Sequence, residues 1–361
     1  MTKRVFPAIL ALLFVLVSFA PAAFAAEDNG TLRLNDAIAR ALNQNSGLKL
    51  QELNLETAED KLDDMRDNIE HVPATNIYEP GISSTWSSYL SAANSDRIAQ
   101  KSYENMKQQL VVDVKDKYYG ILSGKRDVSL AEASLKTAQI ELAQARVKKQ
   151  IGMMTQADLL TAETQAQNAG TNLISAQNGL DQAYTQLSLL TGMSDTLRPE
   201  LIDEAVFEKA EFTSLEAITS IALSGNYTVW AAEKTAELAD RVEMYADDYD
   251  MGVINTKIKE IEASDSKEQL KEEVKVLYQS LQTMEEKKVT LEQKVASQEE
   301  TLRVTRYKHE FGLATALQEL KAEQSCNSAQ DELRQLVYEY DLAKSQLLVL
   351  SGKDIIPDST I

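Results

Sequence analysis

The stretch at residues 145–192, ARVKKQIGMMTQADLLTAETQAQNAGTNLISAQNGLDQAYTQLSLLTG, decides the fold because it occurs twice. Residues 305–352, TRYKHEFGLATALQELKAEQSCNSAQDELRQLVYEYDLAKSQLLVLSG, align with it without a gap. From residue 146 onward, 15 of 47 positions are identical. The shared positions include Arg146, Gly152, Thr155 and Glu163, which align with Arg306, Gly312, Thr315 and Glu323. A repeat of this length indicates a duplicated architecture.

Each copy contains a tight turn between two helices. In the first copy a polar helix ends at Gly152, and a glycine just after a helix end takes the left-handed conformation that closes the last carbonyls. Thr155 then caps the next helix, and Asp158 three residues later completes a capping box. The second copy repeats the pattern with Gly312, Thr315 and Gln318. The sequence therefore predicts two long antiparallel helical hairpins with tips at residues 151–155 and 311–315.

Apolar residues at a spacing of three and four follow both arms of the first hairpin, as in the seam of an antiparallel coiled coil. On the arm after the turn the seam consists of Leu159, Ala162, Ala166, Ala169, Leu173, Ala176, Leu180, Ala183, Leu187 and Leu190. The single cysteine, Cys326, aligns with Ala166, so we expect a small buried core residue and no disulfide. The fold class is thus mainly all-α, with at most a small β portion.

The remaining segments divide the chain into two halves. Residues 1–25 are predicted to be a signal peptide, since Lys3-Arg4 precede an apolar run and Ala23-Phe24-Ala25 is a cleavage site. Residues 26–192 form the first repeat, residues 193–214 a linker with one short helix, and residues 215–352 the second repeat. Residues 71–95, rich in serine, proline and aromatics, are predicted to be loop or short extended structure, with helix resuming near Asp96. Residues 245–256 are a reduced counterpart of this insertion, and residues 353–361 are a frayed tail.

Composition excludes nucleic acid as a partner. Without the two basic residues of the signal peptide, 35 basic side chains stand against 56 acidic ones. A surface that binds phosphate backbones is basic instead. The acidity fits either the solubility of a highly exposed surface or an acidic lumen that favours cations.

With the repeat, the opening Leu34-x-x-Ala37-Ile38 and the later Asn45, the chain resembles the TolC family of outer-membrane efflux ducts. The resemblance covers most of the chain after residue 25 and implies a protomer of an α-helical tube (α-barrel) made by a homotrimer. It also implies that a periplasmic adaptor (membrane fusion protein) and an inner-membrane pump dock at the closed end of the tube. The adaptor-contacting tips would be Arg146, Gly152, Met153, Met154, Thr155, Arg306, Gly312, Leu313, Ala314 and Thr315. The resemblance also implies that the chain lies in the outer membrane or periplasm.

The insertions depart from the family pattern. Members cross the outer membrane with four strands per chain, two from each insertion, and such strands alternate apolar and polar over about 9–11 residues. Residues 82–90 (ISSTWSSYL) lack clean alternation, and residues 245–256 (YADDYDMGVINT) carry three aspartates. We therefore expect the membrane-crossing part of this chain to be reduced or missing.

The residues that carry enzyme chemistry are not arranged in any catalytic pattern. The two histidines, His71 and His309, occupy non-equivalent places, and the sequence contains no HExxH, CxxC or phosphate-loop motif. We expect no catalytic, cofactor or metal site. Two alternatives to a duct stay open: a structural or adhesive coiled-coil protein of the envelope, and an adaptor. Adaptors, however, flank a single hairpin with β-rich domains.

Overall fold

The computed structural model describes residues 30–70, 80–212, 214–246 and 248–357. The predicted signal peptide, His71 and the end of the tail lie outside these ranges. In chain order the elements are β1 (Thr31–Leu32), α1 (Leu34–Gln44), α2 (Ser46–Glu70), α3 (Pro80–Gln150), α4 (Gln156–Thr191), β2 (Glu200–Leu201), α5 (Leu215–Gly225), α6 (Tyr227–Glu243), α7 (Tyr249–Glu310) and α8 (Ala316–Leu350). The mainly all-α fold is confirmed.

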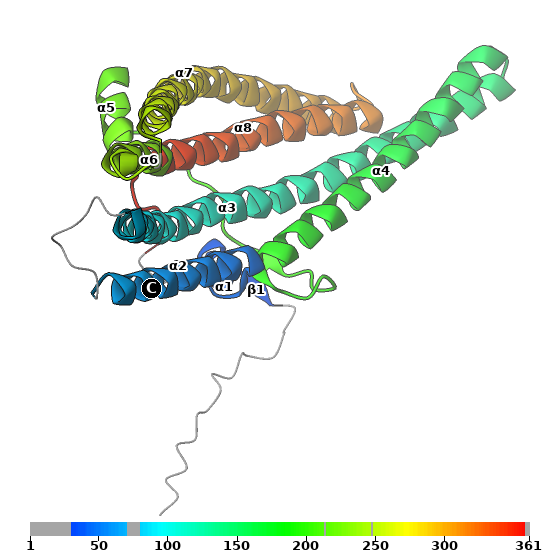
Figure 1. The fold of residues 1–361 in the computed structure, drawn as a ribbon. Helices are drawn as coiled ribbons and strands as arrows, with labels where there is room; N and C mark the ends of the chain where they lie inside the picture. The colour runs from blue at the N-terminus through cyan, green and yellow to red at the C-terminus, as the bar shows by residue number, and fades with distance from the viewer. Residues whose placement is uncertain (1–29, 71–79, 213, 247, 358–361) are drawn as a thin grey trace, which may run out of the picture.

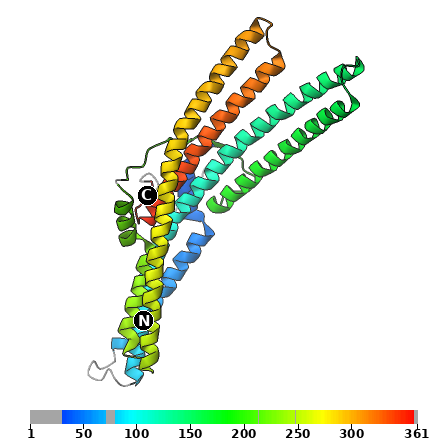
Figure 2. The same cartoon turned by 90° about the horizontal axis from the view of Figure 1, so that it is seen from above.

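Two long hairpins, α3–α4 and α7–α8, dominate the molecule and project toward the same end (Figure 2). The predicted seam lies on the packed side of α4, where Ala169 and Leu187 are buried and the other seam residues are at least half-buried. Leu281 and Leu291 of α7 and Cys326 of α8 are buried in the same way in the second hairpin. The antiparallel hairpins predicted from the repeat are thereby confirmed.

The helices α2, α3, α4, α6, α7 and α8 form a wall one helix thick, in which α3 and α7 run through both halves (Figure 1). The short helices α1 and α5 pack against this wall. Toward the hairpin tips the neighbours along the wall are α4, α3, α8 and α7. Toward the other end they are α2, α3, α6 and α7. The two edges of the wall are consequently α7 on one side and α4 together with α2 on the other.

Two asparagines lie where a short helix ends and a helix of the wall begins: Asn45 between α1 and α2, and Asn226 between α5 and α6. Asn45 caps α2 by accepting a hydrogen bond from Leu48 N at 3.0 Å, and its Nδ2 donates to the Leu190 carbonyl at 3.2 Å. Asn226 does the same in the second half, with Val229 N at 3.1 Å and the Leu350 carbonyl at 3.2 Å. Each asparagine therefore ties the start of one wall helix to the end of the hairpin of its own half.

The linker after α4 is extended where we predicted one short helix. Its strand β2 pairs in parallel with β1, with Leu32 opposite Leu201. The hydroxyl of Tyr118 donates to the Leu32 carbonyl at 2.9 Å and accepts from Asp203 N at 3.1 Å. Because these bonds satisfy the extended backbone, a helix is not required there.

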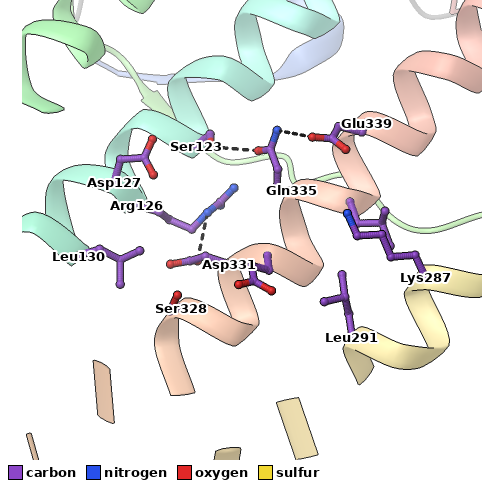
Figure 3. A pocket seen from close by; sticks show the side chains of 12 residues that line it. Ser123, Arg126, Asp127, Leu130, Lys287, Leu291, Ser328, Asp331, Gln335 and Glu339 are labelled. Carbon is purple, nitrogen blue, oxygen red and sulfur yellow. Dashed lines mark hydrogen bonds and ion pairs between the residues drawn. The ribbon is translucent and has the colours of Figure 1, made fainter. Parts of the chain in front are cut away.

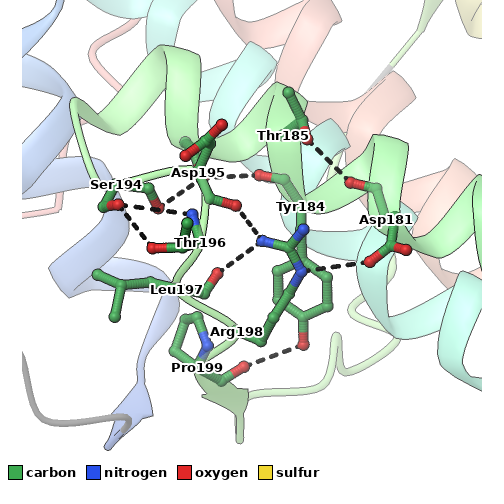
Figure 4. A network of polar contacts seen from close by, with 10 residues as sticks. Asp181, Tyr184, Thr185, Ser194, Asp195, Thr196, Leu197, Arg198 and Pro199 are labelled. Atoms are coloured by element: carbon green, nitrogen blue, oxygen red, sulfur yellow. Dashed lines mark hydrogen bonds and ion pairs between the residues drawn. The ribbon is translucent and has the colours of Figure 1, made fainter.

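Side chains of α4 hold the beginning of the linker (Figure 4). The Arg198 guanidinium lies over the Tyr184 ring, 5.1 Å from its centroid, and Arg198 Nε is 3.4 Å from Asp181 Oδ1. The Tyr184 hydroxyl donates to the Pro199 carbonyl at 3.0 Å. Asp181 aligns with Asp341 in the repeat. Its partner Arg198, however, belongs to the linker, which is not part of the duplication.

The prediction for residues 71–95 is wrong from residue 80 onward, since α3 begins at Pro80; residues 71–79 lie outside the described residues. Proline is tolerated in the first turn of a helix, where its missing N–H has no partner to lose. Ala92 is then buried, and α2 and α6 pack beside this part of α3. Tertiary packing thus overrides the loop propensity of a serine-rich stretch.

The counterpart at residues 245–256 is also largely helical. Asp248 caps α7, which begins at Tyr249, and α6 already extends to Glu243. The tail is not frayed as far as residue 357: Ile355 N donates to Gln108 Oε1 at 2.9 Å, and Gln108 Nε2 donates to Asp354 at 2.8 Å. Within the described part of the chain, no helix has the length and apolarity needed to span a membrane.

Candidate docking site at the hairpin tips

The two hairpin tips have the same backbone geometry. Gly152 and Gly312 have φ values of 76° and 70°, in the left-handed region that favours glycine. Met153 N donates to the Lys148 carbonyl at 2.8 Å, and Leu313 N donates to the Lys308 carbonyl at 2.7 Å. These bonds close the last turn of α3 and α7 in a Schellman motif. The turn predicted from the glycines is confirmed in both copies.

Capping boxes start the returning helices. Thr155 Oγ1 accepts from Asp158 N at 3.1 Å, and Thr155 N donates to Asp158 Oδ2 at 3.2 Å. Thr315 makes the equivalent pair of bonds with Gln318, at 3.2 and 2.8 Å. The hydrogen bonds from the Thr155 hydroxyl and backbone lower the pKa of the Asp158 carboxyl, which keeps it charged at the positive end of α4.

Each tip presents two large apolar side chains to solvent. Ile151 and Met153 are 63% and 75% exposed, and the repeat-equivalent Phe311 and Leu313 are 77% and 78% exposed. Met154 and Ala314, by contrast, are half-buried. An apolar pair at the same place in both hairpins suits contact with another protein surface better than solvent.

Ion pairs brace the hairpin arms just behind the tips. Arg146 lies 3.7 Å from Glu163, and the equivalent Arg306 lies 3.7 Å from Glu323. Arg306 also approaches Glu319 at 3.5 Å, and Glu319 contacts His309. Both arginines are more than half exposed, so the pairs stabilise the arms only slightly. The arginines thus remain accessible beside the apolar pairs.

A second polar cluster joins the two hairpins farther along the wall (Figure 3). Arg126 of α3 exposes 15% of its side chain, and its Nε lies 3.3 Å from Asp331 Oδ1 of α8. Its Nη1 donates to the Tyr338 hydroxyl at 3.0 Å. Burial, and next the charge of Asp331, raise the pKa of Asp127, which lines the same groove.

The cluster continues along α3 toward the middle of the molecule. The Tyr119 ring stacks on the Tyr338 ring with centroids 4.7 Å apart, and its hydroxyl donates to Asp341 Oδ2 at 2.9 Å. Lys115 Nζ lies 3.0 Å from the same oxygen. Burial, and then Asp341, raise the pKa of Tyr119, so the phenol stays a donor. These contacts fix the position of one hairpin against the other.

The prediction from the sequence named ten residues at and near the tips as an adaptor contact, which stays a prediction, and it missed three features of the site. It left out Ile151 and Phe311, although both are apolar residues at the polar end of a helix. It did not pair Arg146 with Glu163, although both are identical between the copies. The inter-hairpin cluster could not be found from identity between the two copies, because residue 126 is arginine and its counterpart, residue 286, is glutamate.

A one-layer wall of antiparallel helices, duplicated and ending in two capped apolar tips, defines a protomer of a TolC-type duct. The model of the family described as "Outer membrane efflux protein" matches residues 82–193 and 249–353, more than half of the chain. The chain belongs to the outer membrane efflux protein family, which comprises TolC-like ducts of efflux systems. No curated protein matches it by sequence.

Solved structures with the same fold are outer-membrane channels. The CmeC outer membrane channel of Campylobacter jejuni shares 12% identity at a TM-score of 0.69, covering 88% of this chain and 85% of CmeC. The open state of the MtrE outer membrane channel of Neisseria gonorrhoeae shares 15% identity at a TM-score of 0.68, covering 89% of each chain. The outer membrane protein VceC of Vibrio cholerae shares 14% identity at 0.66, covering 89% and 96%. The family and these neighbours are channel proteins rather than enzymes.

Proposed function

We propose that this chain is one protomer of a homotrimeric tube in the cell envelope and conducts its cargo passively, without catalysis. The observation that carries the proposal is the wall itself, whose edge helices keep apolar side chains uncovered. A tube of such walls encloses a water-filled path. Energy would come from an inner-membrane pump, joined to the tube by a periplasmic adaptor.

The edges of the wall support closure into a ring. On one edge α7 exposes Ile254, Ile258, Ile261 and Val276, each between 47% and 61%. On the other edge α2 exposes Leu50 and Leu53, and α4 exposes Ile174, each between 57% and 61%. Because the two edges differ, contacts between copies are head-to-tail, and a head-to-tail contact closes into a ring when the wall is curved. The number three comes from the family.

The hairpin tips are the surface proposed to meet the adaptor. Their four exposed apolar side chains supply a contact that favours burial, and Arg146 and Arg306 stand beside them as exposed cations. Gly152, Thr155, Gly312 and Thr315 hold this surface in a fixed shape, which lowers the entropy cost of docking. The residues inside each turn, Met154 and Ala314, contribute packing between the arms.

Binding of the purified chain to the periplasmic adaptor of its own cell tests the docking surface. Met153→Asp and Leu313→Asp are each expected to weaken binding by about tenfold or more, since a charge replaces a buried apolar contact. Val206→Asp is the matched control, because Val206 in the linker is 75% exposed, as Met153 is. Unchanged binding by both tip variants, or an equal loss with Val206→Asp, would contradict the docking proposal.

A further inference from the structure

A groove between α3 and α6 carries a surplus of positive charge in a strongly acidic chain. Tyr89, Leu90, Ala93, Asn94 and Arg97 of α3 and Lys234, Glu237, Leu238 and Arg241 of α6 line this basic groove. On each helix these residues recur at intervals of three and four, so they share one face. The start of α3 and the helix α6, which line the groove, lie in the half of the wall that points away from the hairpin tips (Figure 2).

Three cations face one carboxylate in the basic groove. Glu237 contacts Lys234 and accepts from Arg241 Nη2 at 2.6 Å, so this single carboxylate serves both cations of α6. The Arg97 side chain makes no ion pair or hydrogen bond with the described residues. The formal net charge of the whole chain is −19, so a local excess of cations is contrary to its general character.

Arginine and lysine side chains on an apolar floor are suited to bind oxyanions. Arginine donates two parallel hydrogen bonds to phosphate, and such charge-assisted bonds are among the strongest in proteins. Leu90, Ala93 and Leu238 line the groove and are partly buried, and an apolar lining of this kind strengthens the attraction between opposite charges. Asn94 and the Tyr89 hydroxyl add neutral donors at its rim.

We propose that the basic groove binds a phosphate-type anionic group between Arg97 of α3 and Lys234 and Arg241 of α6. The anionic group supplies the negative charge that Glu237 alone does not provide for the three cations, and it links the two helices. Its source is either a free phosphate compound or the headgroup of an anionic lipid. The proposal does not depend on docking at the hairpin tips.

The chain carries its own reporters for this site. Trp86 and Trp230 are its only two tryptophans, and both flank the basic groove. Trp86 lies edge-on to Tyr89 with centroids 6.1 Å apart. Trp230 lies one helical turn before Lys234, under Lys101 Nζ at 4.6 Å. An anion in the groove therefore changes the electrostatic surroundings of both indoles.

Titration of the mature protein with inorganic phosphate, followed by tryptophan fluorescence and calorimetry, tests the proposal. Chloride is exchanged for phosphate at constant ionic strength so that general screening stays the same. Saturable binding is expected, weakened about tenfold or more by Arg97→Gln and by Arg241→Gln. Arg97→Gln breaks no ion pair of the fold, so its loss of binding is not a loss of structure. Lys136→Gln on an exposed part of α3 is the control and keeps wild-type affinity.

Vesicles separate the two sources of the anion. Co-sedimentation with phosphatidylglycerol vesicles but not with phosphatidylcholine vesicles, lost in Arg97→Gln, assigns the groove to a lipid headgroup. Phosphate binding without vesicle binding assigns it to a free anion. No saturable binding of phosphate by either method and no vesicle binding overturns the proposal. Equal affinity of the wild type, Arg97→Gln and Arg241→Gln for phosphate also overturns it.

Discussion

At the scale of single residues, the tips depend on two glycines whose role is conformational. A Cβ added to Gly152 or Gly312 meets nothing within 4 Å, so a larger residue is resisted only by the left-handed backbone. A Cβ added to Gly179 also meets nothing within 4 Å, but Gly179 lies inside α4 with ordinary helical geometry. Comparing alanine at these three positions therefore measures the free energy that the left-handed conformation of the turn costs a residue other than glycine.

Gly152→Ala and Gly312→Ala are each expected to lower the free energy of unfolding by about 1 kcal/mol, since alanine disfavours positive φ. Gly179→Ala is expected to raise it by up to about 1 kcal/mol, because alanine has the better helix propensity. Urea denaturation measures all three. A stabilising effect at either tip would show that the turn does not need the left-handed conformation.

The capping box makes a prediction about pH. The Thr155 hydroxyl and backbone lower the pKa of Asp158, so this pair contributes stability above the ordinary aspartate pKa of about 4. That contribution is lost as the pH falls through the lowered value. Carbon-13 NMR titration of Asp158 should show its pKa rising toward the ordinary value in Thr155→Val. Thr315→Val, which disrupts the Gln318 box, should leave it unchanged; an equal shift in both variants would contradict the local cause.

At the scale of elements, the inter-hairpin cluster holds the two hairpins of one protomer together. Arg126→Gln removes the guanidinium that joins Asp331 and Tyr338 and leaves Asp331 in a half-buried site. We expect a loss of about 1–3 kcal/mol in the free energy of unfolding by denaturant. Arg303→Gln, which breaks an exposed pair with Glu300 inside α7, should change it by less than about 0.5 kcal/mol. A similar loss of unfolding free energy in the two variants would contradict the claim that this cluster holds the hairpins together.

The sequence predicted those elements whose signal is local or repeated. The hairpins, the capped turns and the buried place of Cys326 follow from glycine, threonine and apolar positions close together in the chain. The start of α3 at Pro80 did not, because packing against α2 and α6 decides it over local propensity. The pairing of β1 with β2 and the contact of Arg126 with Asp331 join residues far apart in sequence, and neither carries a periodic pattern.

At the scale of the whole molecule, a single wall leaves its edges incomplete. The exposed apolar side chains of α7 on one edge and of α2 and α4 on the other have no cover within one protomer. Ile258→Glu places a charge on the α7 edge and is expected to shift the protein toward monomer. Val206→Asp places a charge on an apolar linker residue that is even more exposed, and it should leave assembly unchanged. Sedimentation velocity of the two variants at equal concentration compares them, and a wild-type profile for Ile258→Glu would exclude this edge from the interface.

The most direct test is the mass of the chain without the predicted signal peptide, from about residue 26, in plain buffer and in mild detergent, with negative-stain images of the same samples. A trimer with a central lumen in either medium is the predicted result, because the two edges of each wall then cover one another. A monomer in both media would contradict the duct and leave a structural coiled-coil protein of the envelope as the better description.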